Sequence, residues 1–295
     1  MTEKRILNTL PAPTFGWLGV NSLEREVLVP EGVKELKAEG AEPLRIEVAD
    51  SGLYEINTQA EQFIIMFMSG DNKKTVSVKI HGAEGTRTKL VQVFEKGTQT
   101  VSSVSAELAD SAELELVQLY LGGADTASEV KAELLGYSAK LTADIGYLLD
   151  NDDKLDINLI ADHYGRKTLS EIRVRGVMDG SSQKTFKGTI DFKNGAIGAK
   201  GSENEEVLLM NESVRNRTVP LILCAEEDVE GSHGASIGRI NEEHIFYMQS
   251  RGISEEKIYE LMAKAKTEQI IKCIGDSETA ERINRALGRG DEDNE

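Results

Sequence analysis

Three alternating runs between residues 155 and 190 decide the fold: Leu155-Asp-Ile-Asn-Leu-Ile160, Ile172-Arg-Val-Arg-Gly-Val177 and Lys184-Thr-Phe-Lys-Gly-Thr-Ile190. Apolar and polar residues alternate within them, which is typical of a β-strand with one buried face. Similar runs recur back to about residue 56, separated by Gly, Asn, Asp and Ser. We therefore expect an all-β core over residues 56–240. The alternation fits a sandwich, a jelly roll or a stacked β-helix, and the even spacing favours the β-helix.

The apolar period changes to that of a helix after about residue 240. Asn241, Ser254 and Ser277 are predicted to begin three helices, and Gly252 and Gly288 to end the first and third. The expected inward-facing residues are Ile245, Phe246 and Met248, then Ile258, Leu261, Met262 and Ala265, and finally Ala280, Ile283 and Leu287. The predicted parts are a mixed N-terminal segment (1–55), the β core (56–240), a small α-helical C-terminal subdomain (241–288) and a disordered acidic tail (289–295).

The composition excludes several classes of partner. Among 295 residues, 51 acids outnumber 34 bases, which gives a net charge of −17. Such an excess argues against binding to nucleic acid or to an anionic membrane surface. We find neither a secretory signal nor a stretch long enough to cross a membrane, so a cytoplasmic protein is expected. Two cysteines cannot form a four-thiolate metal site alone, so a metal must be shared or transient.

Common catalytic and nucleotide-binding motifs are missing from the sequence. There is no phosphate-binding Gly-x-x-x-x-Gly-Lys-Ser/Thr loop, so no nucleotide is expected on this chain. Gly195, Gly198 and Gly201 follow no βαβ unit and are not a dinucleotide fingerprint. A β-helix polysaccharide lyase or hydrolase is an alternative, but such enzymes usually carry a secretion signal and an aromatic sugar-binding cleft, and aromatic residues make up only 5% here.

One segment, residues 220–238, carries residues suited to metal chemistry. Cys224 ends an apolar run, and His233 follows in a Gly/Ser-rich stretch. Thiolate and imidazole are ligands for iron, zinc or iron–sulfur clusters. Nine extended residues would span about 30 Å. The two side chains could therefore share a metal only if the chain turns near residues 228–231, or if a partner supplies one of them.

The acids that follow Cys224 bear on its reactivity. Glu226, Glu227 and Asp228 disfavour a thiolate at Cys224, although an arriving cation would make them tolerable. A plainer interpretation makes Cys224 a small buried strand residue and His233 a turn residue. His81, His163 and Cys273 are expected to be structural.

The stretch from Ser232 to Ile253, Ser-His-Gly-Ala-Ser-Ile-Gly-Arg-Ile-Asn-Glu-Glu-His-Ile-Phe-Tyr-Met-Gln-Ser-Arg-Gly-Ile, resembles the C-terminal signature of the SufB/SufD family of iron–sulfur cluster assembly proteins. Upstream, Arg175-Gly-Val177, Phe186-Lys-Gly188 and Leu208-Leu209 resemble the family's core blocks in the expected order. The resemblance implies a right-handed parallel β-helix with helical ends.

The resemblance also implies a function. It predicts a non-catalytic scaffold that carries a transient iron–sulfur cluster shared between subunits. The expected partners are a SufB/SufD-like paralogue or a second copy of the chain, a SufC-like ATPase and a sulfur-donating desulfurase system. A metal-free structural subunit of the same complex is the alternative.

At the positions of the family's motif residues, this chain combines SufB-type and SufD-type features. His233 matches the histidine of the SufD-type block, and Cys224 matches a SufB-type cysteine. Glu205 stands where SufB-type chains have another cysteine, and Gly231 where SufD-type chains have theirs. Cys224 and His233 are thus the predicted cluster ligands; the weaker iron-site candidates are Glu205, Glu226, Glu227 and Asp228. The resemblance places the ATPase-binding surface at Ile245, Phe246, Tyr247, Arg251, Ile258 and Leu261.

Overall fold

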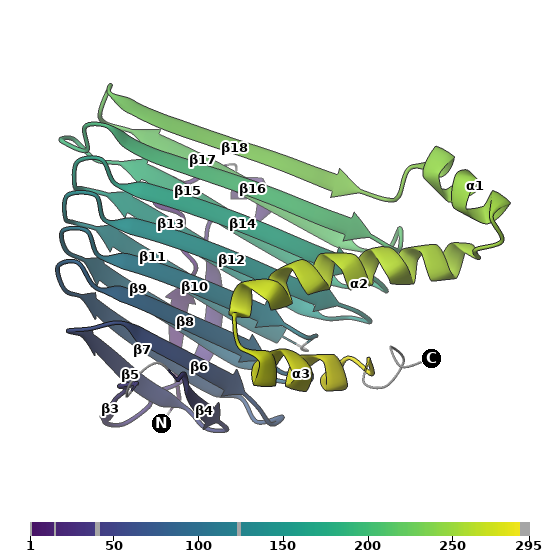
Figure 1. The fold of residues 1–295 in the computed structure, drawn as a ribbon, viewed down its shortest axis with the longest axis horizontal. Coiled ribbons are helices and arrows are strands. Elements are labelled where there is room, and N and C mark those ends of the chain that lie inside the picture. The colour runs from purple at the N-terminus through teal and green to yellow at the C-terminus, as the bar shows by residue number, and fades with distance from the viewer. Residues whose placement is uncertain (1, 15, 39–41, 123–124, 290–295) are drawn as a thin grey trace.

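Two facing parallel sheets of eight strands each form the body of the molecule (Figure 1). The computed structural model describes residues 2–14, 16–38, 42–122 and 125–289. The chain alternates between the sheets, so each inner strand pairs with the second strand before it and the second after it. This arrangement is a β-helix and confirms the predicted fold class. All but residue 289 of the predicted acidic tail lies outside the described residues.

The odd-numbered sheet consists of β3 (Val33–Glu35), β5 (Gly52–Thr58), β7 (Lys74–Gly82), β9 (Thr100–Leu108), β11 (Asp125–Leu134), β13 (Lys154–His163), β15 (Gln183–Phe192) and β17 (Arg215–Cys224). The even-numbered sheet consists of β4 (Leu44–Val48), β6 (Gln62–Met68), β8 (Arg87–Phe94), β10 (Glu113–Tyr120), β12 (Lys140–Leu149), β14 (Leu169–Met178), β16 (Ala199–Leu209) and β18 (Val229–Gly238).

The register of the strands stacks identical positions of successive turns. One inward ladder of the even-numbered sheet runs through Ile64, Leu90, Leu116, Ala143 and Ile172, all essentially inaccessible to solvent. Each apolar residue therefore packs on its equivalents above and below, and the alternation in the sequence becomes a continuous core between the sheets.

Three helices follow the last strand. They are α1 (Glu242–Ser250), α2 (Glu255–Ile274) and α3 (Ser277–Ala286). Asn241 and Ser254 cap the first two, as predicted. The cap of α3 is Asp276 rather than Ser277, because the Asp276 carboxylate accepts the Thr279 amide at 3.0 Å. Both α2 and α3 lie along the outer face of the even-numbered sheet, while α1 projects beyond it (Figure 1).

The predicted inward faces of α1 and α2 need correction. Phe246 is 73% exposed, and Leu261 and Met262 are about 40% exposed. The buried face of α2 consists of Ile258, Tyr259, Thr267, Ile270, Ile271 and Ile274. The prediction failed because the first half of α2 carries apolar residues on two sides, and only contact with the sheet determines which side is covered.

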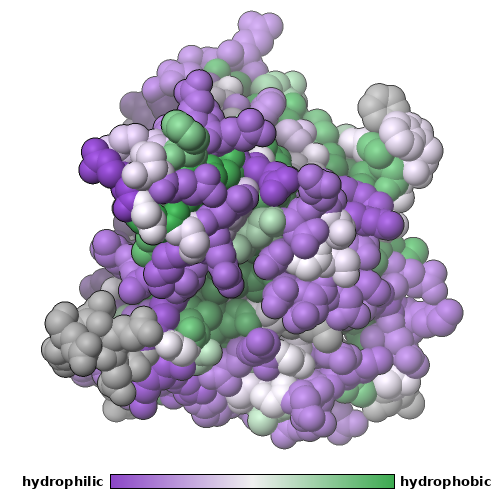
Figure 2. All heavy atoms as spheres, turned by 90° about the vertical axis from the view of Figure 1, so that its right-hand side faces the viewer, coloured by the Kyte–Doolittle hydropathy of each residue, from purple (hydrophilic) through white to green (hydrophobic). Residues whose placement is uncertain are grey.

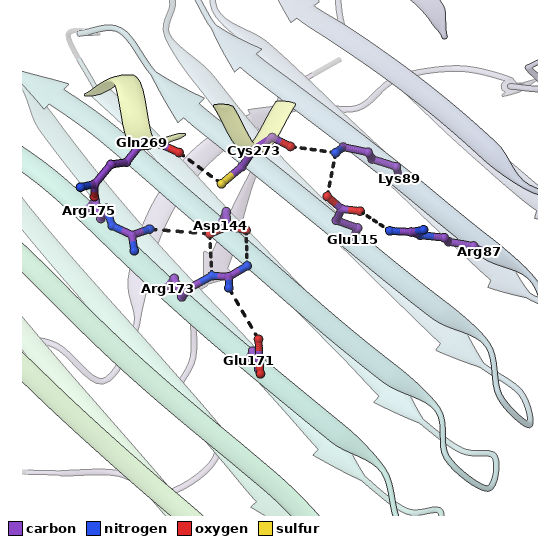
Figure 3. Close-up of polar contacts among 9 residues, drawn as sticks. All are labelled: Arg87, Lys89, Glu115, Asp144, Glu171, Arg173, Arg175, Gln269 and Cys273. Atoms are coloured by element: carbon purple, nitrogen blue, oxygen red, sulfur yellow. Dashed lines mark hydrogen bonds and ion pairs between the residues drawn. The ribbon is translucent and has the colours of Figure 1, made fainter. Parts of the chain in front are cut away.

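Polar contacts surround the C-terminal end of α2 (Figure 3). Asp144, 2% exposed in its side chain, binds the Arg173 guanidinium through two hydrogen bonds of 2.8 and 2.7 Å. Lys89 Nζ donates to the Cys273 carbonyl at 2.7 Å. The half-buried Cys273 thiol donates to the Gln269 carbonyl, and burial together with the charge of Asp144 raises its pKa. These contacts give Cys273 a structural environment.

The side of the molecule at which the even-numbered strands end is mostly hydrophilic, with apolar residues visible between the polar ones (Figure 2). A recess of about 460 Å³ on this side is lined by Leu121, Leu148 and Leu287 together with Asp150 and Asp179. The three leucines belong to the apolar cluster beneath α2 and α3. The recess is thus a continuation of the helix packing.

An N-terminal hairpin completes the fold. It pairs β1 (Thr2–Leu7) with β2 (Leu23–Leu28) in antiparallel register, with a short 3-10 helix (Gly16–Leu18) between them. After β1, Asn8 Nδ2 donates to Asp156 Oδ1 at 2.6 Å, and the Asn8 carbonyl accepts from the buried Lys187 Nζ at 3.0 Å. These bonds fix the hairpin to the odd-numbered sheet. In the described part of the chain, no helix has both the length and the apolar character needed to cross a membrane.

Candidate functional site at the open end of the β-helix

The last turn of the β-helix leaves an open end. Among the described residues, β17 and β18 each have a hydrogen-bonded neighbour on one side only. Register assigns their inward positions, because parallel partners point to the same side of a sheet. Cys224 lies above the buried Phe192, and His233 lies above Glu203. Both predicted ligands therefore occupy inward positions with no further turn to cover them, and both are exposed.

The structure separates Cys224 from His233. The chain does turn, over residues 225–228, between β17 and β18. However, His233 lies four positions beyond Val229, or about 13 Å along the strand. Ile222 and Gly231 lie between them and approach each other so closely that a Cβ on Gly231 would be 3.0 Å from Ile222 Cγ2. Within the described ranges, no three His, Cys, Asp or Glu side chains converge as a metal site would require.

The three acids of the turn between β17 and β18 differ in their contacts. Glu226 accepts the amides of Gly195 at 3.1 Å and of Glu227 at 2.9 Å, and these bonds lower the pKa of Glu226. Its carboxylate is thus engaged in holding adjacent turns together. Glu227 and Asp228 are exposed and are not held in this way.

Glu205 lies inside the β-helix. Its carboxylate pairs with Lys184, and both side chains are 0% exposed. Thr218 Oγ1 donates to Glu205 Oε2 at 2.7 Å, and Lys184 Nζ donates to Thr218 Oγ1 at 3.1 Å. Desolvation lowers the pKa of Lys184, although the charge of Glu205 opposes this effect. Glu205 therefore neutralises a buried ammonium one layer below the open end.

Glu203 was missed by the sequence reasoning. It is 4% exposed, and among the described residues its carboxylate has neither a hydrogen bond nor an ion pair. Burial, and then the nearby charge of Glu205, raise its pKa to about 7. The carboxylate occupies space left by Gly188, whose Cβ would lie 1.9 Å from Glu203 Oε2. The signal that could have revealed it is the ladder Ile64, Leu90, Leu116, Ala143, Ile172, which is apolar up to Glu203 and His233.

The six residues predicted to form the ATPase-binding surface differ in their exposure. Phe246 and Tyr247 of α1 are exposed, and the Arg251 guanidinium carbon lies 5.1 Å from the centre of the Tyr247 ring. Leu261 is also exposed, whereas Ile245 is half-buried. Ile258 is completely buried and does not contribute to this surface, because it lies on the packed face of α2.

The remaining strand histidines lie away from the open end. His163 is completely buried; its Nδ1 and Nε2 lie 2.7 and 2.8 Å from the hydroxyls of Thr168 and Ser170. Burial lowers the pKa of His163 to about 4, so the ring is neutral at pH 7. His81 lies between Glu55 and Glu107 on the odd-numbered sheet.

Comparison with known proteins gives the family. Residues 53–266 match the family model for the SUF system FeS cluster assembly, SufBD core domain. The iron–sulfur cluster assembly protein SufD of Bacillus subtilis is 33% identical over 100 residues, 34% of this chain and 23% of that protein. The SufBD family protein ycf24 of Trieres chinensis is 32% identical over 123 residues, 42% of this chain and 25% of that protein.

The iron–sulfur cluster assembly protein SufD of Escherichia coli is 27% identical over 113 residues, 38% of this chain and 27% of that protein. Each of these matches thus spans about a quarter of the relative. The family model, by contrast, covers well over half of this chain, including the strands that form the open end. The chain therefore belongs to the SufB/SufD family of SUF-system iron–sulfur cluster assembly proteins.

Proposed function

We propose that this chain is a non-catalytic scaffold subunit of a SUF-type complex in the cytoplasm, on which an iron–sulfur cluster is assembled and passed on. The observation that carries the proposal is the open end, where a thiol and an imidazole occupy uncovered inward positions. Cys224 serves as a thiolate ligand or sulfur acceptor, and His233 as a second ligand.

A partner chain completes the cluster site. Cys224 and His233 of one chain are too far apart to ligate one small cluster together, so each acts with ligands of another chain across the junction. The edges of β17 and β18 offer unpaired backbone groups to a strand of that chain. A SufB/SufD-like chain, or a second copy of this one, pairs with these edges and supplies the missing ligands. A desulfurase system supplies the sulfur, and the cluster remains labile because it is shared.

The cluster prediction concerns the two cysteines. After anaerobic reconstitution of the complex with ferrous iron and sulfide, Cys224→Ala is expected to lose most of the visible absorbance of the cluster, because a ligand is lost. Cys273→Ala is the matched control, since its thiol contacts the Gln269 carbonyl beneath α2, and it should retain the spectrum. A Cys224→Ala complex with the parental spectrum would exclude the ligand role. A colourless parental complex that still purifies with its partners would identify the chain as a metal-free structural subunit.

The exposed apolar residues of α1 and α2 bind the SufC-like ATPase. Phe246 is 73% exposed and Tyr247 is 57% exposed on a helix that projects from the body, which is unusual for side chains of this size. We expect Phe246→Ser to reduce co-purification of the ATPase by about tenfold or more, because central aromatic residues dominate such interfaces. Ile6→Ser removes an equally exposed apolar residue from the N-terminal hairpin and serves as the control. Equal loss in both variants, or in neither, would contradict this placement.

A further inference from the structure

Glu203 is a buried carboxylate that makes neither a hydrogen bond nor an ion pair in the described part of the chain, and the charge of Lys184 offsets its burial only in part. Removing an ionised carboxylate from water is costly unless a cation or hydrogen-bond donors replace the water. The nearest ammonium, Lys184, is already engaged by Glu205 and Thr218. Lys184 and Glu205 neutralise each other, so ionised Glu203 would leave one net negative charge beneath the open end.

His233 is the residue directly above Glu203. The two are register partners on adjacent strands, about 4.8 Å apart at the backbone, and both occupy inward positions. The Glu203 side chain is confined against Gly188, whereas the His233 side chain is exposed. A carboxylate oxygen and an imidazole nitrogen on neighbouring strands make a suitable pair of ligands for iron, cobalt or zinc.

We infer that Glu203 and His233 form a half-site that binds one divalent transition-metal cation at the open end. The inference deepens the proposed function and rests on it for the identity of the cargo, which is ferrous iron. The other coordination positions are filled by water or by a partner's ligands, because no third His, Cys, Asp or Glu converges on the pair within the described residues. A site with two fixed ligands releases its ion more readily than a closed one, as delivery requires.

The half-site is spatially distinct from Cys224. Ile222 and Gly231 close the interior between them. The open end thus has a polar part, which contains Glu203 and His233, and an apolar part, which contains Cys224 above Phe192. Iron enters at the polar part and sulfur at the thiol, so the two substrates do not compete for one group.

Anaerobic titration of the metal-free full chain with Co²⁺, followed by its visible absorption, tests the inference. The parent should bind one Co²⁺, and Glu203→Gln and His233→Ala should each weaken binding about tenfold or more. Glu230→Gln, on the outward side of β18, and His244→Ala, on α1, are the matched controls and should bind like the parent. Thermal unfolding of each variant verifies that it is folded.

The outcomes separate this inference from the proposed function. A parent that binds no Co²⁺, or a Glu203→Gln variant that binds it as tightly as the parent, would overturn the half-site and leave cluster assembly through Cys224 intact. Binding that requires Glu203 and His233, in a complex that builds no cluster, would support the half-site and refute only the proposed function. Cys224→Ala should leave the Co²⁺ affinity unchanged.

Discussion

Replacing Glu205 by alanine is expected to lower the free energy of unfolding by about 3–5 kcal/mol, because it leaves a buried ammonium without its partner. Glu205 and Lys184 are both fully buried, and the Thr218 hydroxyl, which already accepts from Lys184, is uncharged and cannot replace the lost carboxylate. The measurement is urea denaturation at neutral pH, followed by circular dichroism. In Glu205→Ala, the lower free energy of unfolding should be accompanied by loss of structure at the open end.

Two further variants test whether the unpaired charge causes the loss. Glu206→Ala removes the neighbouring, outward-facing carboxylate, which binds the partly exposed Lys266 at 3.1 Å, and should cost less than about 1 kcal/mol. Replacing both partners, Lys184→Met with Glu205→Leu, should recover most of the stability. If Glu205→Ala were as stable as Glu206→Ala, Lys184 would not depend on this partner.

Glu203→Gln is expected to stabilise the metal-free protein at pH 8 by up to about 3 kcal/mol. The pKa of Glu203 is raised from 4.5 to about 7. Below about pH 4.5 the carboxyl is protonated in both the folded and unfolded states and costs nothing. Between pH 4.5 and 7 only the unfolded state releases the proton, so stability falls as the pH rises. Above pH 7 the full cost of a buried carboxylate is present, and glutamine avoids it.

Urea denaturation in the presence of EDTA at several pH values between 5 and 8 measures this effect. The parent should lose stability relative to Glu203→Gln across the range, and the difference should be small at pH 5. Glu230→Gln, whose parent side chain is exposed on the outside of β18, should follow the parent throughout. A difference between the parent and Glu203→Gln that does not change with pH would show that Glu203 does not titrate in this range.

The strands were predictable because the alternation reports a local property, whereas the choice of a β-helix over a sandwich or a jelly roll rested on the even spacing and on the family resemblance. Runs such as Leu155–Ile160 have one buried face whichever strand lies beside them, and the spacing of the runs reflects the similar length of successive turns. The helix caps Asn241 and Ser254 were also predictable, since a cap depends on residues within one turn of helix.

The buried face of α2 and the role of Glu203 depend on contacts between distant residues. Leu261 and Met262 are as apolar as Ile270 and Ile271, and only the position of the even-numbered sheet determines which pair is covered. Glu203 lies in an acidic stretch that would ordinarily face solvent. Its inward position follows from its register with Ile172, which no local pattern specifies.

The sequence left open whether the candidate ligands Cys224 and His233 share one site. They could meet only if the chain turned near residues 228–231 or if a partner supplied one of them. The turn joins two facing sheets, and the position of His233 along β18 moves it away from Cys224 and above Glu203. The distance between His233 and Cys224 depends on how β18 lies against the facing sheet, and the sequence alone does not specify this.

The single-neighbour position of β17 and β18 has a consequence for motion. In a linear array of turns, each turn is held by the interfaces with its neighbours, and a terminal turn has one such interface where the others have two. Backbone amides of these strands should therefore exchange with solvent sooner than those of β9 to β14, through local opening that leaves the rest of the array folded. Cys224 and His233 thus belong to a segment that can change shape at low energetic cost, and docking of another chain would remove that freedom.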